Sequence, residues 1–554
     1  MTFLSRLLNT LPVHLLMSFF LVGTLLLHAS MPVHAAGSRW IQGTGLERMS
    51  TDAFADWTGS LEYTGEEYSE LLLLEPVNGV VVPANSASPF IHWTSDASAW
   101  VVRLTAADDF LVQILCSRPY WEPDDKIWRE LISRSAGAVI NVEVLPVGGV
   151  FGRSIGRGVS TLVHVDEHRL ETPIGYLQMP LPFRKAQEHP EKAMWRKALV
   201  SSSEEPETFL SNLPVCANCH TYSADGSTLA FDIDIDADKG SFIHMSTAEP
   251  LNMTRADHGS WNQLSVDTPA PFSFGLFASL SSDGRYLLGT VGETSVFVMI
   301  DRHDFSQMFY PVTGQIAVND RDRQKLFVVP GTDDPAYVHT GPRLSPDDQR
   351  LVFSRAPVNQ DYVDAVLSGQ VRAESGQQTI QQLNERYPFQ FDLYSLPFPS
   401  HNGAAPQPVA GASANGMSNF FPRFSPDGRW IVFTRSPTGL VGQPDSELWV
   451  IPASGGEARR LSANTPVMNS WHSFSPDGRW LVFSGKGHRA ETQTFLARFY
   501  EDGSSAPALR LHRLSLPEFA NVTPEFLPGR AAQIEEIHFL IEQDKQQVFE
   551  KNIR

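Results

Sequence analysis

A polar turn followed by a run of apolar residues recurs along the chain from residue 223 onward. The clearest copy reads Ser-Pro-Asp-Gly-Arg-Trp-Leu-Val-Phe, and copies begin at Ser223, Ser281, Ser345, Ser425 and Ser475. Proline presets φ and glycine adopts a positive φ, so the polar half predicts a tight turn. The apolar half predicts a buried strand that leaves this turn.

The spacing of these copies predicts a β-propeller. The copies begin 50 to 80 residues apart, and each interval contains further strand-like runs, such as residues 391–396 and 446–451. One turn-and-strand unit in an interval of several strands is typical of a propeller blade, and the intervals are too short for separate sandwiches. Five copies and a degenerate closing copy around residues 520–527 predict six blades, with seven as the alternative.

The region before the repeats has a different pattern. Strand-like runs at residues 79–83, 90–93, 99–104 and 139–147 alternate with turns rich in proline and glycine. This predicts an Ig- or fibronectin-like β-sandwich over residues 38–185, a polar linker over 186–212 and the propeller over 213–528. A C-terminal helix is predicted over 529–554, where Ile534, Ile537, Ile541 and Val548 would share one face. The fold class is therefore all-β.

The first residues are those of an export signal. Arg6 supplies a positive charge, residues 15–27 are apolar, and small residues at 33–35 precede Ala36. This predicts a signal peptide over residues 1–35 and a periplasmic or otherwise exported protein. The apolar run is shorter than the roughly 20 residues of a membrane span, so no span is expected after cleavage. Counted from Leu11, the run leaves an uncleaved membrane anchor as the alternative.

Charge and cysteine content narrow the classes of partner. The formal net charge of −19 argues against binding to nucleic acid or anionic lipid. An acidic surface of this kind is usually only solvated, although it could also dock a basic redox partner. The chain has three cysteines, so it does not depend on disulfides. Cys116 lies in a strand-like run and is expected to be buried and inert.

The other two cysteines form the sequence Cys216-Ala-Asn-Cys219-His220, which has the spacing of a c-type haem attachment site. Two thiols three positions apart reach the two vinyl groups of one porphyrin, and the histidine binds the iron. A zinc site would need two further ligands, but no second C-x-x-C or H-x-x-x-H pair exists in the sequence. A thiol redox pair would need the first cysteine at a helix N-terminus, whereas here a proline-containing loop is expected to lead into a propeller strand.

The repeat register suggests where a second iron ligand would come from. His220 and His472 each lie three residues before a repeat serine, in segments expected to be loops. Equivalent loops of different blades converge on one propeller face, so the haem is expected to lie over that face. The candidate distal ligands are His472, Met417, Met468 and His339. His472 is preferred because Trp471 beside it could pack against the porphyrin.

A run of alternating acids is the remaining candidate metal site. Asp232, Asp234, Asp236 and Asp238 precede Gly240, and carboxylates at this spacing could hold Ca²⁺ in a loop. A calcium loop also needs a glycine in its middle and a distal glutamate, which are not in place here. A solvated acidic hairpin is therefore the favoured interpretation.

Several segments together resemble the TolB-like β-propeller proteins, and specifically a bacterial subset that carries C-x-x-C-H in the propeller. They are residues 216–223 (CANCHTYS), 330–335 (PGTDDP), 415–419 (NGMSN), 443–448 (QPDSEL) and 468–472 (MNSWH). The resemblance covers residues 213–526 and implies the fold and the haem attachment. It implies no substrate. Asp348 departs from the pattern, because it stands where the repeat turn usually has glycine.

The sequence thus predicts an exported electron carrier with one covalent haem c. The alternative is an envelope scaffold or sensor, in which haem is structural or regulatory and the partner is an envelope protein. Peroxide-type haem catalysis would need an open sixth position on the iron. Hydrolase activity is not expected, because no α/β segment follows residue 526.

Overall fold

The computed structural model describes residues 39–41, 56–68, 70–148, 153–215, 217–298, 301–304, 308–371, 380–399, 404–439 and 444–542. The chain divides into two units, one formed by residues 1–76 and 90–165 and the other by residues 77–89 and 166–554. Within the described ranges, no helix is both long and apolar enough to cross a membrane. The predicted signal peptide, residues 1–35, lies outside the described residues.

Six antiparallel four-stranded sheets make up the described part of the second unit. Five of them are built from strands that follow one another along the chain. The first two blades comprise β15 (Ala217–Tyr222), β16 (Thr228–Ile233), β17 (Ser241–Ser246) and β19 (His258–Ser260), then β20 (Leu276–Leu280), β21 (Tyr286–Val291), β24 (Gln315–Asp320) and β25 (Lys325–Val328).

The next three blades repeat this plan. They comprise β26 (Tyr337–Leu344), β27 (Arg350–Pro357), β28 (Asp392–Pro397) and β29 (Gln407–Pro408), then β30 (Ser418–Phe424), β31 (Trp430–Ser436), β32 (Glu447–Pro452) and β33 (Arg459–Arg460), then β34 (Asn469–Phe474), β35 (Trp480–Gly485), β36 (Gln493–Arg498) and β37 (Leu509–Arg510). Each repeat serine connects the first strand of a blade to the second.

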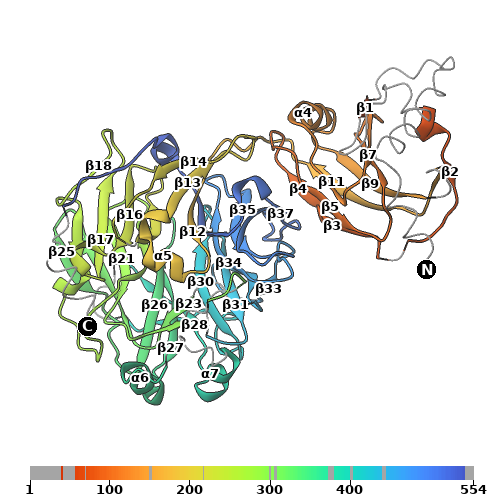
Figure 1. The fold of residues 1–554 in the computed structure, drawn as a ribbon. Coiled ribbons are helices and arrows are strands. Elements are labelled where there is room, and N and C mark those ends of the chain that lie inside the picture. The colour runs from red at the N-terminus through yellow and green to blue at the C-terminus, as the bar shows by residue number, and fades with distance from the viewer. Residues whose placement is uncertain are drawn as a thin grey trace, which may run out of the picture. The chain divides into compact units, whose positions relative to one another are not determined.

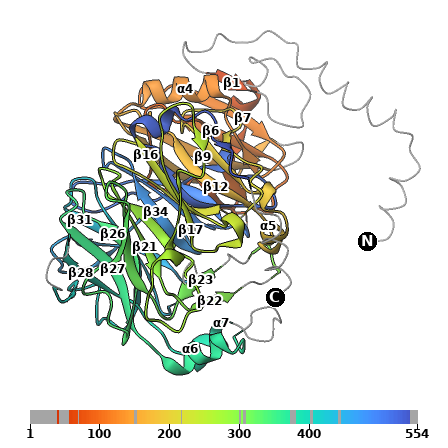
Figure 2. The ribbon, with the colours of Figure 1, turned by 90° about the vertical axis from the view of Figure 1, so that its left-hand side faces the viewer.

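The sixth blade joins the two ends of the unit. Its innermost strand, β38 (Phe519–Phe526), comes from the end of the chain, and its other strands are β12 (Ile174–Pro180), β13 (Met194–Ala198) and β14 (Glu207–Leu210). β38 pairs antiparallel with β12, so hydrogen bonds close the ring. The innermost strands of successive blades contact one another, and Figures 1 and 2 show the propeller from two sides. The predicted six-bladed propeller and the all-β class are thereby confirmed.

The repeat serine and aspartate hold each turn together. In the fifth blade, the Ser475 hydroxyl donates to Asp477 Oδ1 over 2.6 Å and accepts from the Trp480 amide over 2.9 Å. The other copies make the same two contacts. Asp348 adopts the positive φ of the missing glycine, and its carboxylate accepts from the backbone amide and hydroxyl of Ser282 in the preceding blade. These contacts explain why the repeat tolerates aspartate there.

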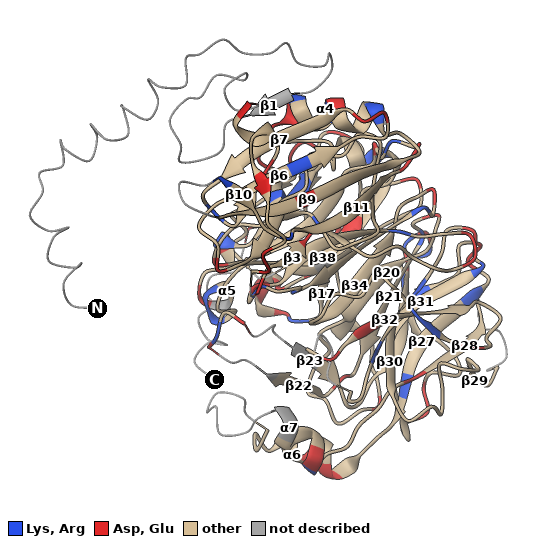
Figure 3. Cartoon of the chain, turned by 90° about the vertical axis from the view of Figure 1, so that its right-hand side faces the viewer, with Lys and Arg blue, Asp and Glu red and all other residues tan. Residues whose placement is uncertain are grey.

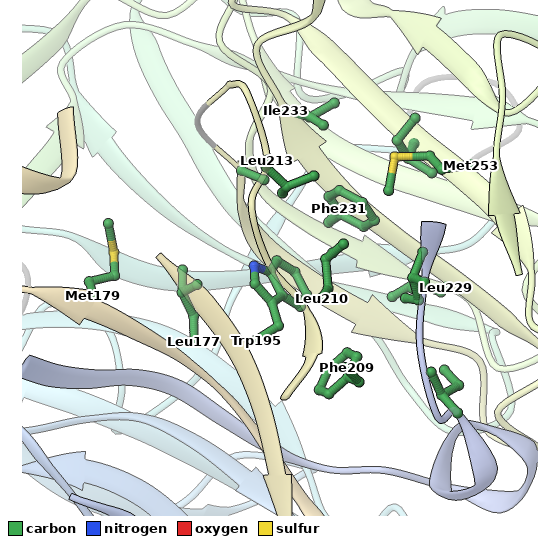
Figure 4. Close-up of a cluster of buried hydrophobic side chains, with 14 of the residues drawn as sticks. Leu177, Met179, Trp195, Phe209, Leu210, Leu213, Leu229, Phe231, Ile233 and Met253 are labelled. Carbon is green, nitrogen blue, oxygen red and sulfur yellow. The ribbon is translucent and has the colours of Figure 1, made fainter. Parts of the chain in front are cut away.

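The seam between the sixth and first blades is filled by large apolar side chains (Figure 4). Trp195 of β13 is 1% exposed and packs against Phe209 of β14 and Phe231 of β16. Leu177, Leu210, Leu213 and Leu229 belong to the same buried cluster. The cluster also includes Ala520 and Val522 of β38, so it packs the last strand of the propeller against the first ones.

The boundaries predicted from sequence need correction at this seam. The predicted linker 186–212 is wrong, because it contains β13 and β14, and β12 belongs to the propeller although it falls within the predicted sandwich. The segment is polar for a structural reason. Arg196 of β13 is buried with its guanidinium donating to Gln178 and to the Pro206 carbonyl. The sequence alone does not distinguish a buried, hydrogen-bonded arginine from a solvated one.

The predicted C-terminal helix is also wrong over the residues that the structure describes. A 3₁₀ turn (Gly529–Gln533) is followed by β39 (His538–Phe539), which pairs in parallel with β18 (Asn252–Met253). Ile534, Ile537 and Ile541 are buried, as predicted for one apolar face. An extended segment running over the first blade buries them equally well. Val548 lies outside the described residues.

Short helices and hairpins connect the blade strands. α5 (Arg184–Glu188) lies between β12 and β13, and β22 (Ser295–Val298) pairs with β23 (Met308–Pro311) within the second blade. α6 (Gln360–Leu367) and α7 (Ile380–Arg386) lie between β27 and β28 at one end of the propeller (Figure 1). Acidic and basic residues are interspersed along the ribbon (Figure 3).

The described part of the first unit contains two sheets and helical segments at residues 56–59 and 125–134. The larger sheet has the order β1 (Arg39–Ile41), β7 (Leu111–Cys116), β6 (Trp100–Thr105), β9 (Val139–Gly148), β10 (Ser154–Ile155), β2 (Glu62–Tyr63), with β11 (Val159–Val165) paired to β9. The smaller has β3 (Leu72–Glu75), β5 (Ile91–Thr94) and β8 (Tyr120–Trp121). Buried Trp93 and Trp100 connect the two sheets. The sequence pattern missed α4 (Asp125–Arg134), which Asp124 caps through the Ile127 amide. β4 (Val80–Val82) belongs to the second unit.

We expect the Gly226→Ala substitution to destabilise the propeller more than Gly428→Ala. Both glycines occupy the same position of the repeat turn, with φ of 68° and 70°. A Cβ on Gly226 would lie 1.9 Å from the Pro528 carbonyl oxygen, whereas on Gly428 the nearest atom is 3.9 Å away. Gly428→Ala should cost about 1 kcal/mol and Gly226→Ala more than about 2 kcal/mol in urea unfolding. Equal costs would contradict this account of the closing contact.

Candidate functional site in the central channel

A small cavity lies on the propeller axis, where all six innermost strands contribute side chains. Its volume is about 60 Å³. The lining residues, in blade order, are His220, Phe277, Ala278, Gly341, Arg343, Phe421, Pro422, Arg423, Trp471, His472, Thr523, Pro524 and Glu525. The structure thus brings together three residues singled out by sequence, which are His220, Trp471 and His472.

Each innermost strand carries a β-bulge at this level. The pairing register shifts by one residue at the same place in all six blades. At the bulge, five residues have φ between 49° and 63°: Phe277, Gly341, Phe421, Trp471 and Thr523. Four of them are not glycine, and a positive φ is unusual for such residues. Bulges re-aim side chains, which here line the channel.

The last two residues of the C-x-x-C-H motif, Cys219 and His220, lie at this bulge in the first blade. Cys219 lies four residues before its repeat serine, at the same register as Phe277 and Trp471. The pairing of β15 with β16 shifts between Asn218 and Thr221, so Cys219 and His220 lie where the ladder is interrupted. His220 is therefore in a strand and not in the loop expected from sequence. Cys216 and the side chain of Cys219 lie outside the described residues.

His220 is a buried, neutral imidazole. It is 5% exposed, and its ring centroid lies 4.5 Å from that of Trp195 and 5.8 Å from that of Tyr222. Neither ring nitrogen has a hydrogen-bond partner among the described residues. Burial lowers the pKa of His220 to about 4, so at neutral pH it is in the unprotonated form that binds metal ions.

His472 faces the same cavity from β34. Its Nε2 lies 2.9 Å from the Val432 carbonyl oxygen, which can only accept, so Nε2 carries the proton and Nδ1 carries a lone pair. Nδ1 has no partner within the described part of the chain. Burial, together with the positive charges of Arg423 and Arg343, lowers the pKa of His472 to about 3.

The other predicted distal ligands lie elsewhere. Met417, directly before β30, lines a separate cavity of about 710 Å³ with Phe389 and Asp392. Met468 is fully buried directly before β34. His339 lies six residues before its repeat serine, not three, and packs against Tyr337 and Phe353. These three side chains do not line the channel cavity.

Three charged residues of the channel were missed by the sequence analysis. Arg423 Nη1 lies 3.3 Å from Glu525 Oε1, and Arg343 Nη1 donates to the Ala278 carbonyl over 3.0 Å. A signal for the arginines was present, because Pro-Arg precedes the repeat at both 342–343 and 422–423. Glu525 had no such signal, since the closing strand belongs to a degenerate copy.

The alternating acids before Gly240 pair with local partners. Lys239 contacts Asp234, Arg255 Nη1 lies 2.6 Å from Asp236, and Asp238 accepts from Ser260 and Asn262. Across the described residues, no group of three or more histidine, cysteine or acidic side chains is placed to hold a metal ion. The Ca²⁺ hypothesis therefore receives no support from the positions of these carboxylates.

Comparison with known proteins shows similarity at the level of structure alone. No protein-family model matches the chain, and no curated protein does. TolB from Acinetobacter baumannii is 14% identical, over 70% of this chain and 79% of that one, with a TM-score of 0.38. A TolB candidate from Agrobacterium tumefaciens is 16% identical, over 62% of this chain and 89% of that one, with a TM-score of 0.33. Hydrazine synthase from Kuenenia stuttgartiensis is 13% identical, over 55% of this chain and 70% of that one, with a TM-score of 0.29. Scores this low carry no argument, so the fold rests on the sheet topology.

We expect buried histidines to make the propeller less stable in acid. Burial lowers the pKa of His339 to about 4, whereas an unfolded histidine titrates near 6.5. The unfolded chain therefore takes up the proton first, and stability is lost as pH falls from about 6.5 towards 4. His339→Asn introduces the residue found at this register in the next three blades, namely Asn419, Asn469 and Asn521.

The loss of unfolding free energy between pH 7.5 and 4.5 should be about 2 kcal/mol smaller in His339→Asn than in the unaltered protein. Urea unfolding at the two pH values measures it. His303→Asn, the same replacement at an exposed position, corrects for the change itself. An identical pH dependence in His339→Asn and the parent would show that His339 is not the source.

Proposed function

We propose that this chain is an exported protein with one covalent haem c, attached through Cys216 and Cys219 and bound axially by His220, and that it transfers single electrons. The observation that carries the proposal is the C-x-x-C-H motif at the bulge of the first blade. Its histidine is held neutral and without a hydrogen-bond partner among the described residues. A c-type haem supplies a one-electron iron couple when bound.

The cavity limits where the porphyrin could lie. Sites for drug-sized ligands measure about 300–1,000 Å³, far more than the 60 Å³ of the channel. A porphyrin therefore does not fit inside the channel, and we place it where β15 begins, next to Cys216 in the sequence. In this arrangement Trp195 packs against the His220 ring and sets its orientation.

Of the candidate sixth ligands, His472 has the best support. It lines the same cavity as His220, whereas Met417 and Met468 do not. Its Nε2–H donates to the Val432 carbonyl, which fixes the tautomer that leaves Nδ1 as the available atom. Histidine ligands of metals usually donate their other ring N–H in this way.

We expect mature protein made with a c-type maturation system to bind one haem that survives denaturation, because thioether bonds do not dissociate. A haem-stained denaturing gel, a pyridine haemochrome spectrum and the intact mass test this. The Cys216→Ala/Cys219→Ala variant should lose the haem. Cys116→Ala is the matched control, since Cys116 is the third cysteine and is buried in the first unit. A colourless parent protein with the mass of the polypeptide alone would refute the proposal.

The same holoprotein separates electron transfer from the scaffold alternative. Rapid reduction by a small cytochrome, with a reversible potentiometric titration, supports electron transfer. A stable complex with an envelope protein that forms equally in both redox states supports a scaffold in which the haem is structural.

We expect the His472→Ala variant to retain the haem and to change from a low-spin to a high-spin spectrum, because one axial ligand is removed. Met417→Leu, which alters a candidate outside the channel, should leave the spectrum unchanged. Absorption and electron paramagnetic resonance spectra of the ferric proteins measure the spin state. A low-spin spectrum in His472→Ala that is lost in Met417→Leu would assign the ligand to Met417 instead.

A further inference from the structure

The channel cavity contains polar atoms that the protein does not satisfy. Five such atoms are buried and lack a hydrogen-bond partner among the described residues. They are His220 Nδ1 and Nε2, His472 Nδ1, Thr523 Oγ1 and Glu525 Oε2. Their side chains come from three blades and all line the same cavity. Buried polar groups are normally paired, so this concentration points to a bound polar species.

The charge of the lining indicates the sign of that species. Arg343 and Arg423 contribute two positive charges, and Glu525, which pairs with Arg423, contributes one negative charge. The cavity wall therefore carries a surplus of one positive charge in surroundings where charge is poorly solvated. A monovalent anion would neutralise it, whereas a cation would add to it.

The cavity volume sets the size of the anion. At about 10–15 Å³ of accessible volume for each water molecule, 60 Å³ holds on the order of four to six waters. A halide with a few waters fits this space, and so does a small oxyanion. A nucleotide or a sugar acid does not.

We propose that the axial channel binds one small monovalent anion, held by the guanidinium groups of Arg343 and Arg423 and by the hydroxyl of Thr523. A water beside the anion would donate a hydrogen bond to Glu525 Oε2. Charge-assisted hydrogen bonds from two arginines are the strongest available here. The site does not depend on the haem, because its anion-binding groups come from the third, fourth and sixth blades.

Bromide is the probe, because its anomalous scattering identifies it in a crystal. Crystals of the mature protein and of the haem-free Cys216→Ala/Cys219→Ala variant should both show a bromide peak between Arg343, Arg423 and Thr523. A cavity that contains only water in sodium bromide would overturn the proposal. Bromide in the haem-free variant would support the anion site even if the haem proposal fails.

A measurement in solution tests the role of Arg343. The thermal unfolding midpoint should rise with sodium bromide relative to sodium gluconate at equal ionic strength, because gluconate is too large for the cavity. Arg343→Gln should weaken the bromide affinity at least about tenfold, the loss expected for one charged hydrogen bond. Arg350→Gln is the control, since Arg350 is half-buried in the same blade and donates to Ala453 and Ser395 instead.

Arg350→Gln should retain the bromide response of the parent. Equal responses to bromide and gluconate in the parent, or an undiminished bromide response in Arg343→Gln, would overturn the proposal. If Arg343→Gln fails to fold, the crystallographic result on the unaltered protein still decides it.

Discussion

The antiparallel pairing of β12 with β38 is the interaction on which the rest of the propeller depends. It joins residues 174–180 to residues 519–526, and in doing so it brings both ends of the second unit into one blade. Without it, β12 and β38 would each expose an unpaired edge to water, and the first and fifth blades would each lose the cover over one apolar face. The closure also positions two groups of the candidate site. It packs Trp195 against His220 and places Glu525 beside Arg423.

The bulges at the axis direct side chains into the channel and so form the candidate site. Six strands converge there, and a residue with positive φ in each of five blades faces the cavity. For the four that are not glycine, this conformation costs on the order of 1–2 kcal/mol each. Such strain concentrates at functional positions in many proteins. In the remaining blade, the first, the equivalent position is Cys219, so the C-x-x-C-H motif ends at the register where the hydrogen-bonded ladder is interrupted.

The proposed haem and the proposed anion site have a common electrostatic basis. The channel wall is positive, and its two histidines are kept neutral by burial. A positive charge near the iron would favour the reduced haem, which is the less positive form. A bound anion would offset that preference. The channel would thereby couple the reduction potential to the anion it holds, through charge alone and without a change of fold.

The sequence by itself determined the repeats, a count of six or seven blades and the C-x-x-C-H motif, because each depends on neighbouring residues. A tight turn needs Ser-Pro-Asp-Gly in order, and a porphyrin with two vinyl groups needs two cysteines at one spacing. The equivalence of His220 and His472 also followed from register alone. Only the tertiary structure decided the extent of the sixth blade, the extended C-terminal segment and the polar groups of the channel. These depend on which distant strands lie side by side. A half-buried arginine such as Arg343, or a buried acid such as Glu525, has the same local sequence pattern as a solvated one until the ring is closed.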